Sequence, residues 1–437
     1  MDLMFTTRYV KDNIEAIRES LSRRKSDYPL DKLLALDSES AGMRQELQEL
    51  RTERNAGSRK LSEAKKSGGE ADGTLSKRLL EVKSRIIELE GRLEKYDSEI
   101  NSLLLNMPNI LDKAVPYGAD ESSNVELKKV GEAKKRSIPG HEEILKNLGL
   151  LELEKAAEVS GARFYYLKGD GALLEQALIR FAIDRITKSG YTLISPPLML
   201  RKEYYKGVTA LGDFEEALYK VVDPFESDAR EGLEKLEDEL FLISTSEHAI
   251  AAMHSGKVFS AKELPGKYVG ISPCFRREAG AHGKDSKGIF RVHQFYKVEQ
   301  FAFSRVEDSP KLFGELMGNS EMIFTELGLP YRIIEICTGD IGSVAARKQD
   351  LEAYMPAQDR YREMVSCSNC TDWQALRLNI RYDEGGERKY AHTLNSTALA
   401  VSRTIVAIVE NYYSESDGSI EIPDALVGYM GKSKIVR

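Results

Sequence analysis

The segment that decides the fold runs from Ser272 to Phe303 and reads SPCFRREAGAHGKDSKGIFRVHQFYKVEQFAF. An apolar stretch at 268–271 leads into it. A loop rich in Gly, Lys and Asp lies in its middle, and apolar and polar residues alternate from Phe290 onward. Such alternation is typical of a half-buried strand. Two such strands around a loop predict an antiparallel β-hairpin.

The side chains of this hairpin suit a ligand that contains phosphate and a purine. Arg276 and Arg291 each offer a fork of fixed donors, so together they can hold both ends of a phosphate or carboxylate chain. Phe295 offers a ring face for stacking, and the carboxylates of Glu278 and Glu299 can accept hydrogen bonds or bind Mg²⁺. The pattern alone leaves open an ordinary charged surface hairpin.

Length, charge and cysteine content limit the class of protein. A chain of 437 residues predicts two or three domains. The net charge of −7 argues against general coating of nucleic acid, so any RNA contact requires a local basic patch. Four cysteines and an N-terminus without a signal-peptide core favour a reducing, cytoplasmic location. No stretch approaches ~18 apolar residues, so we expect no membrane span.

The N-terminal part carries the pattern of two long helices. Apolar residues recur at spacings of three and four from Leu75 to Leu103, which is a heptad seam. The stretch after Leu33 keeps the same phase, and the glycine-rich turn KKSGGEADG separates the two. Helices joined by a short turn pack antiparallel. We expect an arm at 1–108 with a coiled-coil hairpin at about 27–106, a linker at 109–135, and an α+β body on an antiparallel sheet at 136–437.

The outer half of the arm is basic. Between Arg51 and Arg85 there are ten basic residues and only five acids, a net charge of +5 on a chain that is negative overall. Such a patch attracts phosphates, although the pattern leaves open a solvated coiled coil with no RNA role. The candidate RNA-binding residues are Arg51, Arg54, Arg59, Lys60, Lys65, Lys66, Lys77, Arg78, Lys83 and Arg85.

The hairpin sequence FRREAG…FRVHQFYKVEQ resembles motif 2 of the class II aminoacyl-tRNA synthetases, in the form found in the seryl-tRNA synthetase family. The segment GYTLISPPLML at 190–200 resembles motif 1, and AHTLNSTALAVSRTIVAIVENYY at 391–413 resembles motif 3. FLISTSEHA at 241–249 and AYMPAQDRYREMVSCSNCTDWQALR at 353–377 resemble two further segments of the same family. The resemblance covers essentially the whole chain.

The resemblance implies a zinc-free enzyme that activates L-serine with ATP and Mg²⁺ and transfers it to tRNA(Ser). It leaves tRNA(Sec) open as a second substrate. The N-terminal arm would bind tRNA, and the rest of the chain would form a class II catalytic domain on an antiparallel β-sheet. A homodimer is implied through the motif 1 residues Gly190, Tyr191, Ile194, Pro197 and Leu198.

The resemblance also implies a role for each motif residue. Arg276 would bridge the α-phosphate and the serine carboxylate, and Arg403, expected one and a half turns inside a helix, would meet the γ-phosphate. The implied catalytic residues are Arg276, Glu278, Arg291 and Arg403. The implied ATP site is Arg276, Arg277, Glu278, Arg291, Val292, Phe295, Glu363, Met364, Val365, Ser366 and Arg403, with Glu363 and Ser366 as Mg²⁺ ligands. The implied serine site is Thr245, Ser246, Glu247, Arg276, Glu299, Asn395 and Thr397.

Three other interpretations are weaker. Cys367 and Cys370 form a CxxC pair, but zinc requires two further ligands at matching spacing, so we expect reduced core cysteines and no zinc site. A synthetase-like ligase that loads amino acids onto a carrier protein would lack the arm. A non-catalytic tRNA-binding paralogue would have lost motif residues such as Arg276 and Arg403, which are present here.

Overall fold

The computed structural model describes residues 6–66, 73–210, 217–222, 239–278 and 288–437. The chain divides into two compact units. One consists of Ser26–Met107 together with the described part of Phe5–Arg18, and the other of Glu19–Lys25 and Pro108–Arg437. Two short helices, α1 (Thr7–Asp12) and α2 (Ile14–Arg24), begin the described chain.

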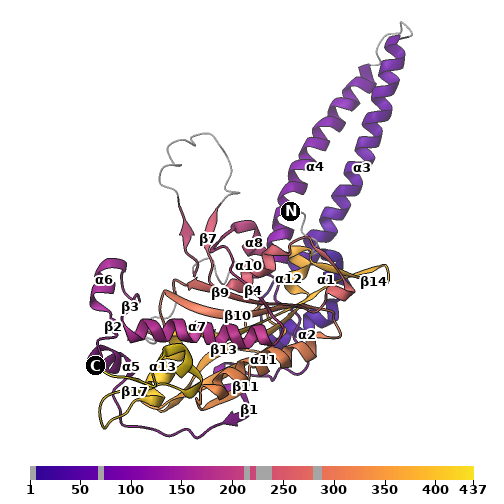
Figure 1. Ribbon diagram of the computed structural model, residues 1–437. Coiled ribbons are helices and arrows are strands. Elements are labelled where there is room, and N and C mark those ends of the chain that lie inside the picture. Colours follow the sequence, from indigo (N-terminus) through magenta and orange to yellow (C-terminus); the bar gives the residue numbers. More distant parts are fainter. Residues whose placement is uncertain (1–5, 67–72, 211–216, 223–238, 279–287) are drawn as a thin grey trace. The chain divides into compact units, whose positions relative to one another are not determined.

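Two long helices dominate the first unit. Helices α3 (Leu30–Lys66) and α4 (Gly73–Asn106) run side by side, as the sequence pattern predicted (Figure 1). Buried apolar side chains from both helices form their seam, because residues three and four apart share one helix face. The seam contains Met43, Leu47, Val82, Ile86, Leu89 and Leu93.

The second unit is built on an eight-stranded sheet with the order β1-β11-β12-β13-β16-β10-β9-β4. Every neighbouring pair is antiparallel except β4 and β9, so the predicted α+β class and antiparallel sheet are confirmed. The strands are β1 (Val125–Val130), β11 (Tyr331–Glu335), β12 (Arg347–Met355), β13 (Arg360–Thr371), β16 (His392–Ala400), β10 (Gln294–Ser304), β9 (Gly266–Phe275) and β4 (Thr192–Ile194).

Helices cover both faces of this sheet (Figure 1). Helices α7 (Asp170–Lys188), α11 (Ser309–Glu326) and α13 (Val401–Tyr412) bury one face in a core that includes Val298 and Ala302 of β10. Helices α8 (Lys202–Val208), α10 (Ser246–Met253) and α12 (Trp373–Leu378) cover part of the other face, against Phe301 and Phe303. Because successive strand residues face opposite sides, the odd-numbered residues of β10 belong to this second face.

Smaller elements complete the second unit. Its short helices are α5 (His141–Asn147), α6 (Glu154–Ser160) and α14 (Asp424–Met430), with the 3₁₀ turns η1 (Glu121–Ser123) and η3 (Ala261–Glu263). One three-stranded sheet joins β15 (Glu387–Tyr390), β14 (Arg381–Glu384) and β8 (Val258–Ser260), and another joins β5 (Met199–Arg201), β7 (Leu240–Leu242) and β6 (Lys220–Val221). Two strand pairs remain: β2 (Leu151–Glu152) with β3 (Tyr166–Leu167), and β17 (Ile420–Glu421) with β18 (Lys434–Ile435).

Three boundaries differ from the sequence expectation. The segment expected as a linker contributes β1, an edge strand that pairs with β11. The second hairpin strand begins at Gln294 rather than near Phe290. Strand β16 continues to Ala400 because it stays paired with β10, so α13 begins at Val401 and Arg403 lies in its first turn. None of the helices in the described part of the chain has the length and apolar character needed to cross a membrane.

Candidate active site

A cavity of about 510 Å³ lies on the second face of the large sheet. Its walls include residues just after β9, residues of β10, β12, β13 and β16, the segment 341–345, and the first residues of α10 and α13. Most of the residues predicted for ATP and serine lie in this wall. They are Thr245, Glu247, Arg276, Glu278, Arg291, Val292, Phe295, Glu299, Glu363, Met364, Ser366, Asn395, Thr397 and Arg403.

Three predicted residues do not line the cavity. Arg277 is exposed just beyond β9 and lines a neighbouring cavity with Lys202 and Tyr219. Ser246 is fully buried against β9 at Gly270, where a Cβ atom would lie 2.7 Å from the Ser246 Cβ. Val365 belongs to the apolar core on the other face of the sheet, because neighbouring strand residues point to opposite sides. Sequence adjacency to a motif residue therefore does not place a side chain in the cavity.

One end of the cavity is rich in arginine. Arg276 donates from Nε to the Ser244 carbonyl oxygen at 3.3 Å, and its guanidinium carbon lies 5.3 Å from the centre of the Phe295 ring. Arg291 donates from Nη1 to Glu278 Oε2 at 2.6 Å. These contacts orient two cationic groups before any ligand arrives, which is the preorganisation that anion binding requires.

Arg403 reaches the same end from the first turn of α13. Its Nη1 donates to the Glu363 carbonyl oxygen at 2.9 Å and lies 3.6 Å from the Glu363 carboxylate. Loss of hydration in the cavity opposes the ionisation of Glu363, but the positive charges of Arg403 and then Lys348 lower its pKa to about 2. Burial lowers the pKa of Arg403. At neutral pH this end holds an ionised carboxylate and several cations, so it can accept a polyanion together with a metal ion.

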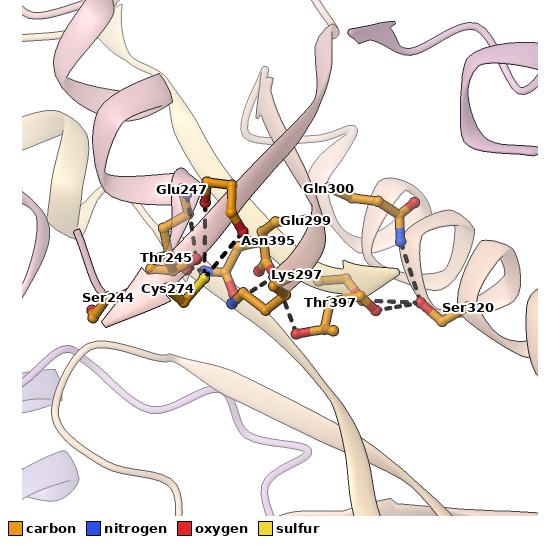
Figure 2. Close-up of polar contacts among 12 residues, drawn as sticks. Ser244, Thr245, Glu247, Cys274, Lys297, Glu299, Gln300, Ser320, Asn395 and Thr397 are labelled. Atoms are coloured by element: carbon orange, nitrogen blue, oxygen red, sulfur yellow. Dashed lines mark hydrogen bonds and ion pairs between the residues drawn. The ribbon is translucent and has the colours of Figure 1, made fainter. Parts of the chain in front are cut away.

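The other end of the cavity carries carboxylates and hydroxyls (Figure 2). Glu299 accepts a hydrogen bond from Thr397 Oγ1 at 3.1 Å, and its Oε2 lies 2.7 Å from Lys297 Nζ. Asn395 Nδ2 donates to Glu247 Oε1 at 3.3 Å. Carboxylates beside a hydroxyl and an amide can bind an ammonium group and a small polar side chain.

Burial changes the protonation of two groups at this end. The pKa of Glu247 is raised to about 7, mainly because burial removes its hydration and secondly because the Glu299 carboxylate lies nearby. Burial also lowers the pKa of His248 to about 3, helped by the positive charges of Lys297 and Arg276. His248 is therefore neutral at physiological pH, whereas Glu247 exchanges a proton there.

A buried hydrogen-bond network holds Thr397 from behind (Figure 2). Ser320 of α11 donates from its hydroxyl to the Thr397 carbonyl oxygen at 2.8 Å. Gln300 donates to the Ser320 hydroxyl at 3.2 Å and accepts from Asn319 at 2.8 Å. Satisfied buried networks of this kind rigidify their surroundings. The hydroxyl of Thr397 is thereby fixed relative to Glu299.

The two residues predicted as Mg²⁺ ligands, Glu363 and Ser366, both lie in the cavity wall, where a carboxylate and a hydroxyl could serve as oxygen donors. Within the described residues, no three His, Cys, Asp or Glu side chains gather closely enough to hold a metal ion by themselves. Mg²⁺ is commonly bound by one or two carboxylates plus substrate phosphates and water. Two oxygen donors beside an anion-binding end fit that pattern.

Sequence reasoning missed several residues of the cavity. Lys297 could have been found, because Phe295, Lys297 and Glu299 alternate along one strand face. Lys348 could not, because it comes from β12 and reaches the site only through the pairing of β12 with β13. Phe290 was expected as an ordinary strand residue, but the centre of its ring lies 3.9 Å from the guanidinium carbon of Arg362 and 4.9 Å from that of Arg403.

The basic residues of the arm lie on α3 and α4. Three of them make ion pairs between the helices: Arg51 with Glu90, Arg78 with Glu53, and Arg85 with Glu46. Exposed members of the group are Arg51, Arg59, Lys60, Lys66, Lys77, Arg78 and Lys83, and Arg54 and Arg85 are partly exposed. The side chain of Lys65 is outside the described part.

Comparison with known proteins tests the expected family. Residues 4–111 match the seryl-tRNA synthetase N-terminal domain, and residues 225–412 match the tRNA synthetase class II core domain (G, H, P, S and T). The chain is 44% identical to a serine–tRNA ligase of Methanocella arvoryzae over 98% of its own length and 99% of the relative's.

Solved structures give the same result over the whole chain. The crystal structure of seryl-tRNA synthetase from Pyrococcus horikoshii complexed with ATP matches with a TM-score of 0.86 and 42% identity, and covers 99% of both chains. The cytoplasmic serine–tRNA ligase of Naegleria fowleri, in complex with AMP, matches with a TM-score of 0.81 and 37% identity over 99% of this chain and 98% of that one. The chain therefore belongs to the seryl-tRNA synthetase family of class II aminoacyl-tRNA synthetases.

Proposed function

We propose that this serine–tRNA ligase binds L-serine and ATP in the cavity on its large sheet and forms seryl-adenylate there. One observation carries the assignment of the site. A single cavity has an arginine-rich end and a carboxylate–hydroxyl end, and Arg276 lines it beside both Ser244 and Phe295. The relative from Pyrococcus horikoshii was solved with ATP, which supports ATP as the nucleotide.

In the first step the serine carboxylate attacks the α-phosphorus of ATP, and pyrophosphate leaves. Arg276 neutralises charge where the carboxylate meets the α-phosphate, and Arg291 and Arg403 hold the β- and γ-phosphates. Phe295 stacks on adenine. Phosphoryl chemistry of this type depends mainly on positioning and charge neutralisation, so it needs no covalent enzyme intermediate. When Mg²⁺ is bound, by Glu363 and Ser366, it neutralises further phosphate charge.

The serine end of the cavity selects the amino acid. Glu247 faces the ammonium group, with Asn395 and the Thr245 cap of α10 holding its position. Glu299 and Thr397 face the hydroxyl of the side chain. Alanine would leave these polar groups unpaired, and the extra methyl group of threonine would have to be excluded by shape.

In the second step the 3′-terminal adenosine of tRNA attacks the adenylate and takes the serine. The arm binds the tRNA through its basic outer half, with tRNA(Ser) as the substrate. The match of residues 4–111 to the seryl N-terminal domain argues against a carrier-protein ligase. Four free cysteines and a tRNA substrate support the cytoplasm as the compartment.

We further propose a homodimer through the motif 1 region. Strand β4 is at the edge of the large sheet, next to β9. Large apolar side chains are exposed on β4 and just after it, namely Leu193, Leu198 and Met199. Exposed apolar groups beside a strand edge are typical of an interface.

The role of Arg276 can be tested by substitution. Arg276→Ala should lower serine-dependent exchange of pyrophosphate into ATP by about 10²–10³-fold or more, because a preorganised cation is lost from the reacting centre. Lysine should rescue poorly, since a point charge does not replace a planar fork. Arg277→Ala is the matched control, because that guanidinium lines a different cavity. Near wild-type exchange in Arg276→Ala would exclude the assignment.

The protonation of Glu247 predicts a pH dependence of serine binding. A serine ammonium group stabilises the ionised carboxylate, so binding should favour the deprotonated form. Below a pKa of about 7, the KM for serine should rise by up to about tenfold per pH unit, while the KM for ATP changes little. Glu247→Gln should give a high serine KM that no longer depends on pH between about 5.5 and 8. A wild-type serine KM that stays constant over this range would contradict the role of Glu247.

The basic outer arm predicts salt-sensitive tRNA binding. Lys66→Glu with Lys77→Glu should weaken tRNA binding and lower the slope of log affinity against log salt by up to about two, because fewer counterions are released. Adenylate formation should persist. Arg92→Glu with Lys95→Glu makes the same charge change on the inner half of α4 and should have little effect. Both double variants are measured by tRNA titration at several salt concentrations. Equal effects of the two on tRNA affinity and salt slope would exclude the outer arm as the tRNA-binding surface.

A further inference from the structure

Lys297 is a buried cation at the serine end of the cavity. It precedes Glu299 by two residues on β10, so both side chains project from the same face of the strand. Lys297 Nζ lies 2.7 Å from Glu299 Oε2, and the two side chains are 7% and 2% exposed. Both residues line the cavity, and Figure 2 shows their side chains meeting beside Thr397.

The hydrogen-bonding capacity of this pair is only partly used within the protein. An ammonium group has three N–H donors, and among the described residues Glu299 is the one ion-pair partner of Lys297. Glu299 Oε2 forms the ion pair with Lys297 and also accepts the hydrogen bond from the Thr397 hydroxyl. Donors of Lys297 and the second oxygen of Glu299 are therefore left for a group in the cavity.

Desolvation makes an unused donor at this place costly. A buried ion pair loses hydration on both partners, and its mutual attraction offsets that loss only when the remaining donors and acceptors are also satisfied. A hydroxyl can satisfy both, because it donates one proton and accepts through its lone pairs. Neither a methyl group nor a hydrogen atom can do so.

We propose that Lys297 is a specificity-determining residue, which donates a hydrogen bond to the side-chain hydroxyl oxygen of serine while Glu299 accepts the hydroxyl proton. The inference rests on the proposed function, since it deepens the assignment of the serine end. It assigns to Lys297 a contact with the substrate beyond neutralisation of Glu299. When alanine is the bound amino acid in place of serine, both hydrogen bonds are lost at once, and the charged groups of Lys297 and Glu299 are left unsatisfied.

The test compares two stable adenylate mimics, seryl-sulfamoyl-adenosine and alanyl-sulfamoyl-adenosine, by calorimetric titration of the full-length protein. We expect Lys297→Met to reduce the preference for the seryl over the alanyl mimic at least tenfold. A purely structural role for Lys297 would weaken both mimics together, so an unchanged preference in a folded Lys297→Met variant would overturn the proposal. Lys128→Met is the matched control, because Lys128 pairs with Glu321 at 2.5 Å on the far edge of the same sheet.

A second comparison covers the case in which Lys297→Met fails to fold because Glu299 is left as an unpaired buried charge. Glu299→Gln removes that charge, so the double variant Lys297→Met with Glu299→Gln can be compared with Glu299→Gln alone. We expect the double variant to show at least a further fivefold loss of preference, and equal preferences would overturn the proposal. Wild-type protein that binds neither mimic would instead overturn the proposed function, which separates the two failures.

Discussion

The pairing of Glu299 with Thr397 across β10 and β16 is the constraint on which the rest of the site depends. This register puts a carboxylate and a hydroxyl side by side on the cavity face, where they are 3.1 Å apart. A shift of the strand register by one residue would turn the side chains of Lys297 and Glu299 away from the cavity and into the apolar core beneath α7, α11 and α13, because strand side chains alternate between faces. Gln300 and Ser320 fix the register from the opposite side of the sheet by holding the Thr397 backbone.

This strand register can place many ionic groups in one cavity because acidic and basic side chains pair with one another there. At the arginine-rich end the guanidinium groups face carboxylates: Arg291 pairs with Glu278, and Arg403 with Glu363. At the carboxylate–hydroxyl end Lys297 pairs with Glu299, and Glu247 is the carboxylate there with a pKa near neutrality. The unbound site is thus already complementary to a polyanion at one end and to a zwitterion at the other. Little reorganisation is then needed as charge moves during adenylate formation.

Local sequence patterns predicted the parts of the fold that depend on local spacing. The seam of α3 and α4 and the β9–β10 hairpin both follow from periodicity. Most of the residues that the motif resemblance implied for ATP and serine line the cavity. What could not be predicted depends on long-range pairing: Lys348 reaches the cavity through β12, and β16 continues to Ala400 because Lys297 of β10 pairs with it there. Arg277, just beyond the end of β9, and Val365, within β13, were misplaced because adjacent residues of an extended segment face different surroundings.

The central claim is that one cavity activates serine and selects it through its hydroxyl. The most direct measurement is amino-acid-dependent exchange of pyrophosphate into ATP, run with serine, threonine, alanine and glycine on the same preparation. A site built to hydrogen-bond a hydroxyl should prefer serine over alanine by about 10⁴-fold or more in kcat/KM, and it should reject threonine less strongly, by shape alone. Comparable exchange with alanine or glycine, or exchange independent of any amino acid, would contradict the account.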